Sequence, residues 1–497
     1  MKITKTDFSA FVETLAERDK NLIEEFFSNF DLKFSLAKKE VAKFKEDFEN
    51  AIIYLSNNGV EIKEILSRIQ LSNLGGFYAR PSILWFSLDD AAKIYPISME
   101  HGRQQVFRMS VYLKQPVSKE LLQIALHFTI KRFPIFATTL KKGFFWHYLD
   151  AVKKHFSVKE ENLLPCQPIK VAKSDSQPFR IRYYENRISV EFFHVLTDGA
   201  GAMTFLKALT KEYLRLQGVF VPISDDVWDI NEIPIKEEFE NAFKNVEKAE
   251  NASGFIEKPV IQMNGGLTRK RPCRMLHFKM NAEKLHHVAK QHGTTITSYL
   301  LAQMFYACSA ATDELKGDIN IQVPVNMRKF YPSKTICNFS MYCGIRMPVE
   351  QIGNKETLIK EISKQLLEKS EKEKMREMIT SAVKTVDTVR YIPLIIKQPI
   401  AKMIFGFLGE KLYTTTFSNL GVIKMPKELS DHIESMDFCL GPHVLNRLAC
   451  TAVTVNNVTT FTISKMTADP AFEEKLYELL EKDGISVDVE GSDYYAR

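Results

Sequence analysis

The sequence predicts an α/β (α+β) protein built from two lobes and preceded by an all-helical extension. Residues 1–75 show only the helical spacing of apolar residues, whereas short alternating strands and amphipathic helices follow each other after Pro81. An acidic and poorly periodic stretch then separates two regions of this second kind. The length of 497 residues is more than one ordinary core fills, which agrees with several domain-sized units.

The composition indicates a well-packed globular protein. Hydrophobic residues make up 45% of the chain and charged residues 26%, unlike a disordered segment. We expect no transmembrane segment, because no run of eighteen or more apolar residues occurs. The N-terminus lacks the features of a secretory signal, and the seven scattered cysteines form no CxxC pair. A cytoplasmic protein with reduced thiols and no bound metal is therefore expected.

The charge pattern gives no sign of nucleic-acid binding. The net charge of +6 permits an anionic ligand, but basic residues alternate with acidic ones, as on solvated helix faces. We expect a monomer that binds small molecules and no nucleic acid.

Residues 1–75 form the predicted helical extension. Apolar residues recur at helical spacing from Phe8 to Leu71. Asn58-Gly59 interrupts this pattern as a helix stop, and Gly75-Gly76 ends it. We expect an appended unit, whose role the sequence does not reveal.

Residues 76–225 are the predicted first lobe. Its first strand spans residues 107–113, and Ser118 caps a helix that ends before Pro134. A hairpin turning at Glu185-Asn186 follows, and its second strand runs directly into His194. The other predicted elements are strands at 138–140, 143–148, 178–183 and 187–193 and a helix at 202–214.

Residues 226–266 are interpreted as the crossing between the lobes, and residues 267–497 as the second lobe, which repeats the style of the first. Residues 391–408 are apolar and interrupted by proline; we favour a buried helix pair over a channel lining or a lipid-facing segment. The second-lobe elements are strands at 274–280, 319–325, 412–417, 449–455 and 459–466 and helices from 282, at 298–310, 355–376 and 470–480.

His194, Asp198 and Gly199 form an HxxxDG motif at the end of a predicted strand. A histidine held there can accept a proton near neutral pH, and Gly199 permits a tight turn into the next helix. By chance the bare motif arises in roughly three chains of a hundred with this histidine content. A buried structural histidine is the alternative, but the strand before the motif and the helix after it favour a functional site.

This motif and further segments resemble the superfamily of chloramphenicol acetyltransferases, plant acyltransferases and peptide-synthetase condensation domains, with bacterial alcohol acetyltransferases as the closest likeness. The resemblance runs from Ser82 to the C-terminus. Condensation domains usually carry a second histidine directly before the catalytic one; Phe193 stands there instead, which favours small-alcohol or lipid-type acyltransferases. The shared segments are LDDAAKIYP at 88–96, the stretch 107–146 with Arg132-Phe133-Pro134, VPVNMR at 323–328, CNF at 337–339 and FSNLG at 417–421.

The resemblance implies a chloramphenicol acetyltransferase-like fold with a tunnel between the lobes. His194 would be the general base, acyl-CoA the co-substrate, and a hydroxyl-bearing small molecule or lipid the acceptor; no cofactor is bound permanently. Asp198 would pair with Arg328 and hold the loop. Candidates for the oxyanion or channel are Ser418, Asn419 and Asn338, and candidates for the 3′-phosphate of CoA are Arg269, Lys270 and Arg271; each also has a purely structural interpretation.

Three functions stay open on the sequence. The preferred one is an acyl-CoA-dependent O-acyltransferase. A condensation-type enzyme using carrier-bound acyl groups is the second, and the lack of a recognisable carrier segment argues against it. A non-catalytic binding protein that retains the fold is the third, and the intact set of His194, Asp198, Gly199 and Arg328 argues against that. Neither the acyl chain length nor the acceptor can be read from the residues.

Overall fold

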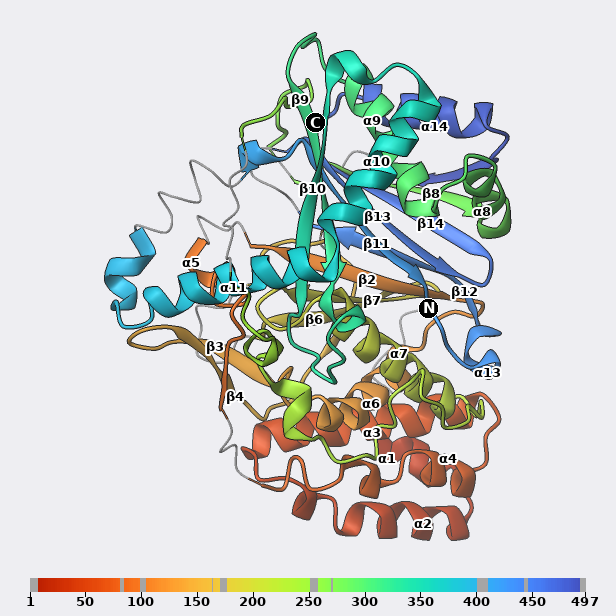
Figure 1. Ribbon diagram of the computed structural model, residues 1–497. Coiled ribbons are helices and arrows are strands. Elements are labelled where there is room, and N and C mark those ends of the chain that lie inside the picture. Colours follow the sequence, from red (N-terminus) through yellow and green to blue (C-terminus); the bar gives the residue numbers. More distant parts are fainter. Residues whose placement is uncertain are drawn as a thin grey trace.

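The computed structural model describes residues 8–80, 85–98, 104–162, 164–169, 177–250, 258–269, 271–399, 410–441 and 446–491. Two lobes stack on each other, and the helices of the extension cover the far side of the first lobe (Figure 1). The strands of the described residues lie in a three-stranded, a five-stranded and a seven-stranded sheet. Short 3-10 turns are Asp31–Lys33, Leu71–Leu74, Ile130–Arg132, Lys236–Phe239, Ala242–Asn245, Met327–Lys329, Val349–Gln351 and Glu410–Leu412.

The helical extension shares its core with the first lobe. Phe44, Phe48 and Ile52 of α3 are fully buried and belong to the same apolar cluster as Leu122 and Phe128 of α6. The extension is therefore packed into the first lobe and is not a self-contained appended unit. Its helices are α1 (Phe8–Glu13), α2 (Glu17–Ser28), α3 (Lys38–Asn57) and α4 (Ile62–Arg68), and α6 spans Lys119–Thr129.

The first lobe is built around a five-stranded sheet in the order β12-β2-β7-β6-β5. The predicted hairpin turns at Glu185, which has a φ of 48°. The predicted strand at 143–148 is displaced, because residues 143–146 form the turn between β3 and β4. Bounds are β1 (Trp85–Ser87), α5 (Tyr95–Ser98), β2 (Val106–Leu113), β3 (Thr138–Lys142), β4 (His147–Ala151), β5 (Val158–Glu160), β6 (Phe179–Tyr184), β7 (Arg187–Phe193) and α7 (Gly199–Leu216).

The second lobe carries the seven-stranded sheet, in the order β10-β9-β11-β13-β14-β8-β15. The predicted helix 355–376 is in fact two helices, α10 and α11, which meet at Ser370-Glu371. Bounds are β8 (Arg274–Asn281), α8 (Ala282–Gln291), α9 (Ile296–Ala310), β9 (Asp318–Asn326), β10 (Ser340–Pro348), α10 (Lys355–Lys369), α11 (Lys372–Thr388), β11 (Thr415–Val422), α13 (Lys427–Ser430), β12 (Ile433–Leu440), β13 (Leu448–Val455), β14 (Val458–Lys465), α14 (Ala471–Lys482) and β15 (Val487–Gly491).

Two strands join the lobes. Strand β12 comes from the second half of the chain but pairs antiparallel with β2 of the first-lobe sheet. Strand β13 is buried on both faces: Val453 and Val455 belong to the first-lobe core, whereas Cys450 and Ala452 belong to the second. Because β13 contributes to both cores, the two lobes are expected to unfold together.

The interpretation of residues 391–408 as a buried helix pair is wrong for its first residues. Tyr391 and Ile395 are 74% and 81% exposed. The backbone N–H of Leu394 donates to Phe144 O at 2.8 Å, so only one side of this segment is anchored, on the β3–β4 turn. Residues 400–408 lie outside the described part. No helix of the described residues is long and apolar enough to cross a membrane.

Candidate active site

Strand β7 and helix α7 place His194 at a strand–turn–helix junction. Phe193 ends the strand in the core, and the backbone N–H of His194 donates to Gln105 O at 2.9 Å. The imidazole lies between two aromatic rings, with centroid distances of 4.8 Å to Tyr95 and 5.0 Å to Phe107. These contacts restrict the ring while leaving the side chain partly accessible.

Asn338 determines which nitrogen of His194 carries the proton. The Asn338 amide group Nδ2 donates to His194 O and to Asp89 Oδ2, both at 3.0 Å. The amide is therefore oriented with Oδ1 toward His194 Nδ1, at 2.8 Å. Because Oδ1 can only accept, Nδ1 must donate, and Nε2 is left with its lone pair. No hydrogen-bond partner of Nε2 occurs among the described residues.

The surroundings keep His194 neutral. Burial lowers the pKa of the imidazole below its ordinary value of about 6.5, while Asp198 and the bond to Asn338 oppose this effect. At pH 7 the ring is therefore uncharged, and Nε2 can accept a proton from an acceptor hydroxyl.

Asp89 is a site residue that the sequence reasoning missed. It is buried, accepts from the backbone and side-chain nitrogens of Asn338 at 3.1 and 3.0 Å, and accepts from Ala92 N at 2.7 Å. Burial raises the pKa of Asp89 to about 6. A carboxylate between apolar residues in the LDDAAKIYP segment was the available signal, but its partner could not be read from the sequence.

Asp198 and Arg328 meet, as the resemblance implied. Arg328 Nη1 donates to Asp198 Oδ2 at 2.8 Å, and the same oxygen accepts from Phe339 N and Ser340 Oγ. The other oxygen caps helix α7 by accepting from Ala200 N and Gly201 N at 3.1 Å. The nearby guanidinium holds the pKa of Asp198 below its ordinary value. Both oxygens of Asp198 are thus engaged in bonds that hold the start of α7 against the second lobe.

A loop of the second lobe is clamped onto the turn that carries His194. Arg328 Nη2 donates to Thr335 O at 2.9 Å and to Cys337 O at 2.7 Å. Thr197 Oγ1 donates to Ile336 O at 2.6 Å. These bonds place Asn338, at the end of the same loop, against the imidazole.

The glycines of the motif region permit close approach. A Cβ on Gly201 would lie 2.2 Å from Ile336 O, so only glycine fits between α7 and the second-lobe loop. A Cβ on Gly199 would lie 3.0 Å from Leu420 Cδ2. The end of strand β11 is therefore next to the motif turn.

Ser418 and Asn419 differ in their availability. Asn419 Nδ2 donates to Thr297 Oγ1 at 3.1 Å, and its Oδ1 accepts from Gly421 N at 2.8 Å, so its amide is already engaged. Ser418 is half-buried, and no side-chain hydrogen bond of its hydroxyl is found in the described part of the chain. Ser418 is thus the better candidate for a donor to a developing oxyanion.

The basic cluster proposed for CoA is only partly described. Lys270 lies outside the described residues. Arg269 is exposed, and Arg271 Nε donates to Thr268 O at 3.0 Å. Neither arginine bonds to the residues around His194 within the described ranges.

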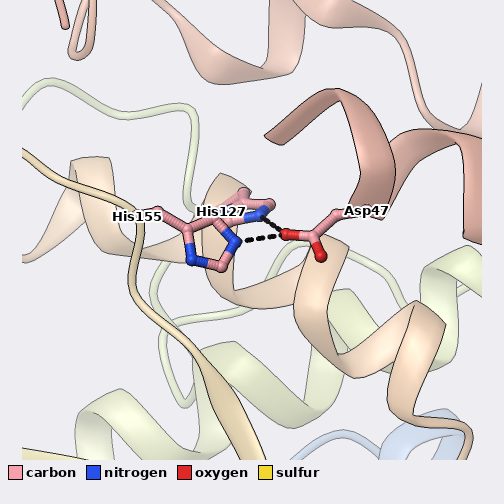
Figure 2. Close-up of side chains that lie close together, drawn as sticks. All are labelled: Asp47, His127 and His155. Carbon is pink, nitrogen blue, oxygen red and sulfur yellow. Dashed lines mark hydrogen bonds and ion pairs between the residues drawn. The ribbon is translucent and has the colours of Figure 1, made fainter. Parts of the chain in front are cut away.

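One group has the ligand chemistry of a metal centre. Asp47, His127 and His155 bring their ligand atoms within 4.8 Å of one another (Figure 2). However, Asp47 Oδ2 lies 2.7 Å from His127 Nε2 and 2.6 Å from His155 Nε2, which are hydrogen-bond distances. Two imidazole N–H groups donating to one carboxylate oxygen account for this cluster, which joins α3 of the extension to the first lobe.

A cavity of about 330 Å³ borders the candidate active site. Its lining includes Ala200, Gly201 and Arg328. His194 does not line it, so we assign it no catalytic role.

Solved structures share this architecture at low sequence identity. The first condensation domain of the calcium-dependent antibiotic synthetase has a TM-score of 0.54 at 12% identity, covering 82% of this chain and 100% of that one. TRI101 of Fusarium sporotrichioides, complexed with coenzyme A and T-2, has a TM-score of 0.53 at 12% sequence identity. The match covers 81% of this chain and 99% of that one. The trichothecene 15-O-acetyltransferase TRI3 of the same organism has a TM-score of 0.51 at 11% sequence identity. The match covers 80% of this chain and 94% of that one. These likenesses show the two-lobed condensation and acetyltransferase fold.

The sequence itself matches a defined family. No curated protein matches the chain. The alcohol acetyltransferase family matches residues 185–482, more than half of the chain, and the match begins just before the strand that leads into the HxxxDG motif. The chain therefore belongs to the alcohol acetyltransferase family and is an acyltransferase.

Proposed function

We propose that the protein is an acyl-CoA-dependent O-acyltransferase in which His194 is the general base. The observation that carries this proposal is the bond between Asn338 Oδ1 and His194 Nδ1, which leaves Nε2 unprotonated on a neutral, partly accessible ring. The family match supports transfer to an alcohol hydroxyl.

The reaction then needs no covalent intermediate on the protein. Nε2 takes the hydroxyl proton as the acceptor oxygen attacks the thioester carbonyl, and the carbonyl oxygen becomes negative. Ser418 is our candidate donor to that oxygen. When the intermediate collapses, the carbon–sulfur bond breaks, the thiolate of CoA leaves, and the imidazolium returns the proton to it. Ester and free CoA are the products.

The donor is proposed by analogy. TRI101 has been solved with coenzyme A, and that structure covers 81% of this chain. Arg269, Lys270 and Arg271 remain our candidates for contact with the 3′-phosphate. A carrier-bound donor is the alternative that the condensation-domain neighbour favours. Comparison of an acyl-CoA with the same acyl group on a phosphopantetheinylated carrier protein distinguishes the two.

The first test is the loss of the base. His194→Ala should reduce turnover by about 10²–10⁴-fold, the usual contribution of one positioned base, and should keep the fold. Acetyl-, octanoyl- and palmitoyl-CoA are incubated with a panel of alcohols, and thiol release is measured. His286→Ala serves as the control, because this histidine is exposed on α8. Near-wild-type turnover in His194→Ala would contradict the mechanism.

A further inference from the structure

We infer that the first lobe carries a second binding site, a pocket that takes a phosphate group. The pocket has a volume of about 240 Å³ and lies between the loop before β5 and the start of β6. Its cationic lining residues are Lys154, Lys159, Arg180 and Arg182, and no Asp or Glu of the described residues lines it. His194 is not among the lining residues, so the pocket is separate from the candidate active site.

Arg182 is the residue that points to a ligand. It is only 9% exposed, and its one side-chain hydrogen bond within the described ranges runs from Nη1 to Glu160 O at a long 3.4 Å. No ion pair of Arg182 is found among the described residues. A buried guanidinium with unused donors is costly unless an acceptor reaches it. Arg180, by contrast, is paired with Glu191 and donates to Gln167 O at 2.6 Å.

The neighbouring ion-pair network leaves Arg182 without an ion pair of its own among the described residues. Two carboxylates serve three other arginines of this sheet: Glu191 binds Arg108 and Arg180, and Glu161 binds Arg108 and Arg187. Burial is the main cause that lowers the pKa of Arg182, and the charge of Arg180 lowers it further, while Glu191 and Glu161 oppose this shift. An anion in the pocket would supply the missing negative charge.

The donor set favours a phosphate over other anions. Planar guanidinium groups bind phosphate oxygens through paired N–H donors, and lysines add point charge. The Gln177 amide, which also lines the pocket, offers a neutral donor for a further oxygen, whereas the Ser157 hydroxyl is already hydrogen-bonded to His155 Nδ1 at 3.2 Å. The same positive charge disfavours a metal ion at the adjoining Asp47 cluster, since His155 lines the pocket as well.

Two sources could supply the phosphate: coenzyme A itself, or a separate phosphorylated ligand. The shared chemistry is a phosphate group bound by Arg182 and Lys159. Binding of pyrophosphate, coenzyme A and 3′-dephospho-coenzyme A to the full chain is measured by calorimetry and by thermal unfolding. The variants are Arg182→Gln and Lys159→Gln. The matched controls are Arg390→Gln and Lys290→Gln, which alter exposed cations far from the pocket in sequence.

Pyrophosphate should bind saturably to the wild type and about tenfold more weakly to Arg182→Gln, as expected for the loss of a charge-assisted hydrogen bond. Lys159→Gln should also weaken pyrophosphate binding. Because Lys159 is exposed, that variant is expected to fold. The control variants should bind like the wild type. If Arg182→Gln weakens coenzyme A but not its 3′-dephospho form, the 3′-phosphate is the source. If Arg182→Gln weakens only the binding of pyrophosphate, a separate phosphorylated ligand is the source of the phosphate.

Two results with the variants and salt controls would overturn the inference, and so would a third with the wild type alone. One is equal pyrophosphate binding by Arg182→Gln, Lys159→Gln and the controls. The other is a stabilisation that sodium chloride reproduces at matched ionic strength, because general screening would then explain it. Absence of any pyrophosphate binding by the wild type would have the same consequence.

Discussion

Asn338 cannot turn its amide round, because Nδ2 already donates to two acceptors, His194 O and Asp89 Oδ2. The orientation of the amide then dictates the tautomer of His194. This role differs from the oxyanion or channel role expected from the sequence. It makes Asn338 a positioning residue that acts through the imidazole.

Asn338→Ala should therefore reduce kcat by about 10²-fold, the usual cost of a misplaced catalytic group, with a smaller change in KM. A purely structural role would lower the melting temperature without this kcat-specific effect. Steady-state kinetics and thermal unfolding are measured in parallel. Asn419→Ala is the control, because that amide bonds to Thr297 and not to His194. Unchanged kcat in Asn338→Ala would contradict the assignment.

The pH dependence of the rate follows from the pKa of His194. The base must be neutral, so activity is lost as pH falls through its pKa, which burial places below the ordinary value of about 6.5. Asp89, with a pKa of about 6, becomes protonated in the same pH range, and its hydrogen bonds from Asn338 are then weakened. The rate should be constant between about pH 7 and 8 and fall only on the acid side. A midpoint of kcat/KM above 6.5 would contradict this.

The motif residues could be predicted from the sequence, whereas their partners could not. His194, Asp198 and Gly199 stand in one short segment between a strand and a helix, so local pattern identified them. Asn338 lies 144 residues further along the chain, and only the packing of the second-lobe loop brings it to the imidazole. The same holds for Asp89, whose contact with Asn338 spans 249 residues.

At the scale of elements, strongly periodic segments were predictable. The hairpin of β6 and β7 and helix α6 with its Ser118 cap lie where the pattern placed them. Strands β1, β5, β10, β12 and β15 were missed. Strand β12 forms by pairing with β2, which lies more than 300 residues earlier in the chain. The local sequence pattern does not encode such a distant partner.

Helix α7 depends on a glycine at its third position. A Cβ on Gly201 would lie 2.2 Å from Ile336 O and 2.3 Å from Thr197 Oγ1. These two oxygens are joined by a hydrogen bond. Gly201→Ala should therefore destabilise the fold by about 1–3 kcal/mol through overpacking, and should lower the rate by displacing the loop that ends at Asn338.

The measurement for Gly201→Ala is the midpoint of denaturant unfolding, together with turnover. Gly353→Ala is the matched control, because nothing lies within 4 Å of a Cβ at that glycine. Equal stability of the two variants would mean that the loop does not pass as close to α7 as described.

At the scale of the whole molecule, four connections make the lobes and the extension one unit. Strand β12 crosses into the first-lobe sheet, and strand β13 is shared between both cores. The extension joins the first-lobe core and is fixed to it by the bonds of Asp47 to two histidines. The change near residue 75 from helical spacing alone to mixed strands and helices could be read from the sequence. The shared core could not, because burial depends on which surfaces meet.

The fourth connection is the ion pair between Asp198 and Arg328, which joins the lobes across 130 residues of chain. Both side chains are buried or nearly so, with 2% and 15% exposure. Removing one partner leaves the other charge without its counter-ion, a loss of about 3–5 kcal/mol for a buried pair. Asp198→Ala should cost more than Arg328→Ala, because it also removes the cap of α7, worth about 1 kcal/mol.

The double variant decides whether this contact is an anchor. Once one charge is gone, the second substitution removes a charge that is already unpaired, so the combined loss of stability should be clearly smaller than the sum of the single losses. Thermal unfolding of the wild type, both single variants and the double variant gives the coupling, and turnover is recorded alongside. His194→Ala should behave differently, with rate lost and melting temperature nearly kept, since its ring serves the chemistry and not the joint between the lobes. Strictly additive losses would mean that Asp198 and Arg328 do not interact, and that the second-lobe loop is held against the motif by something else.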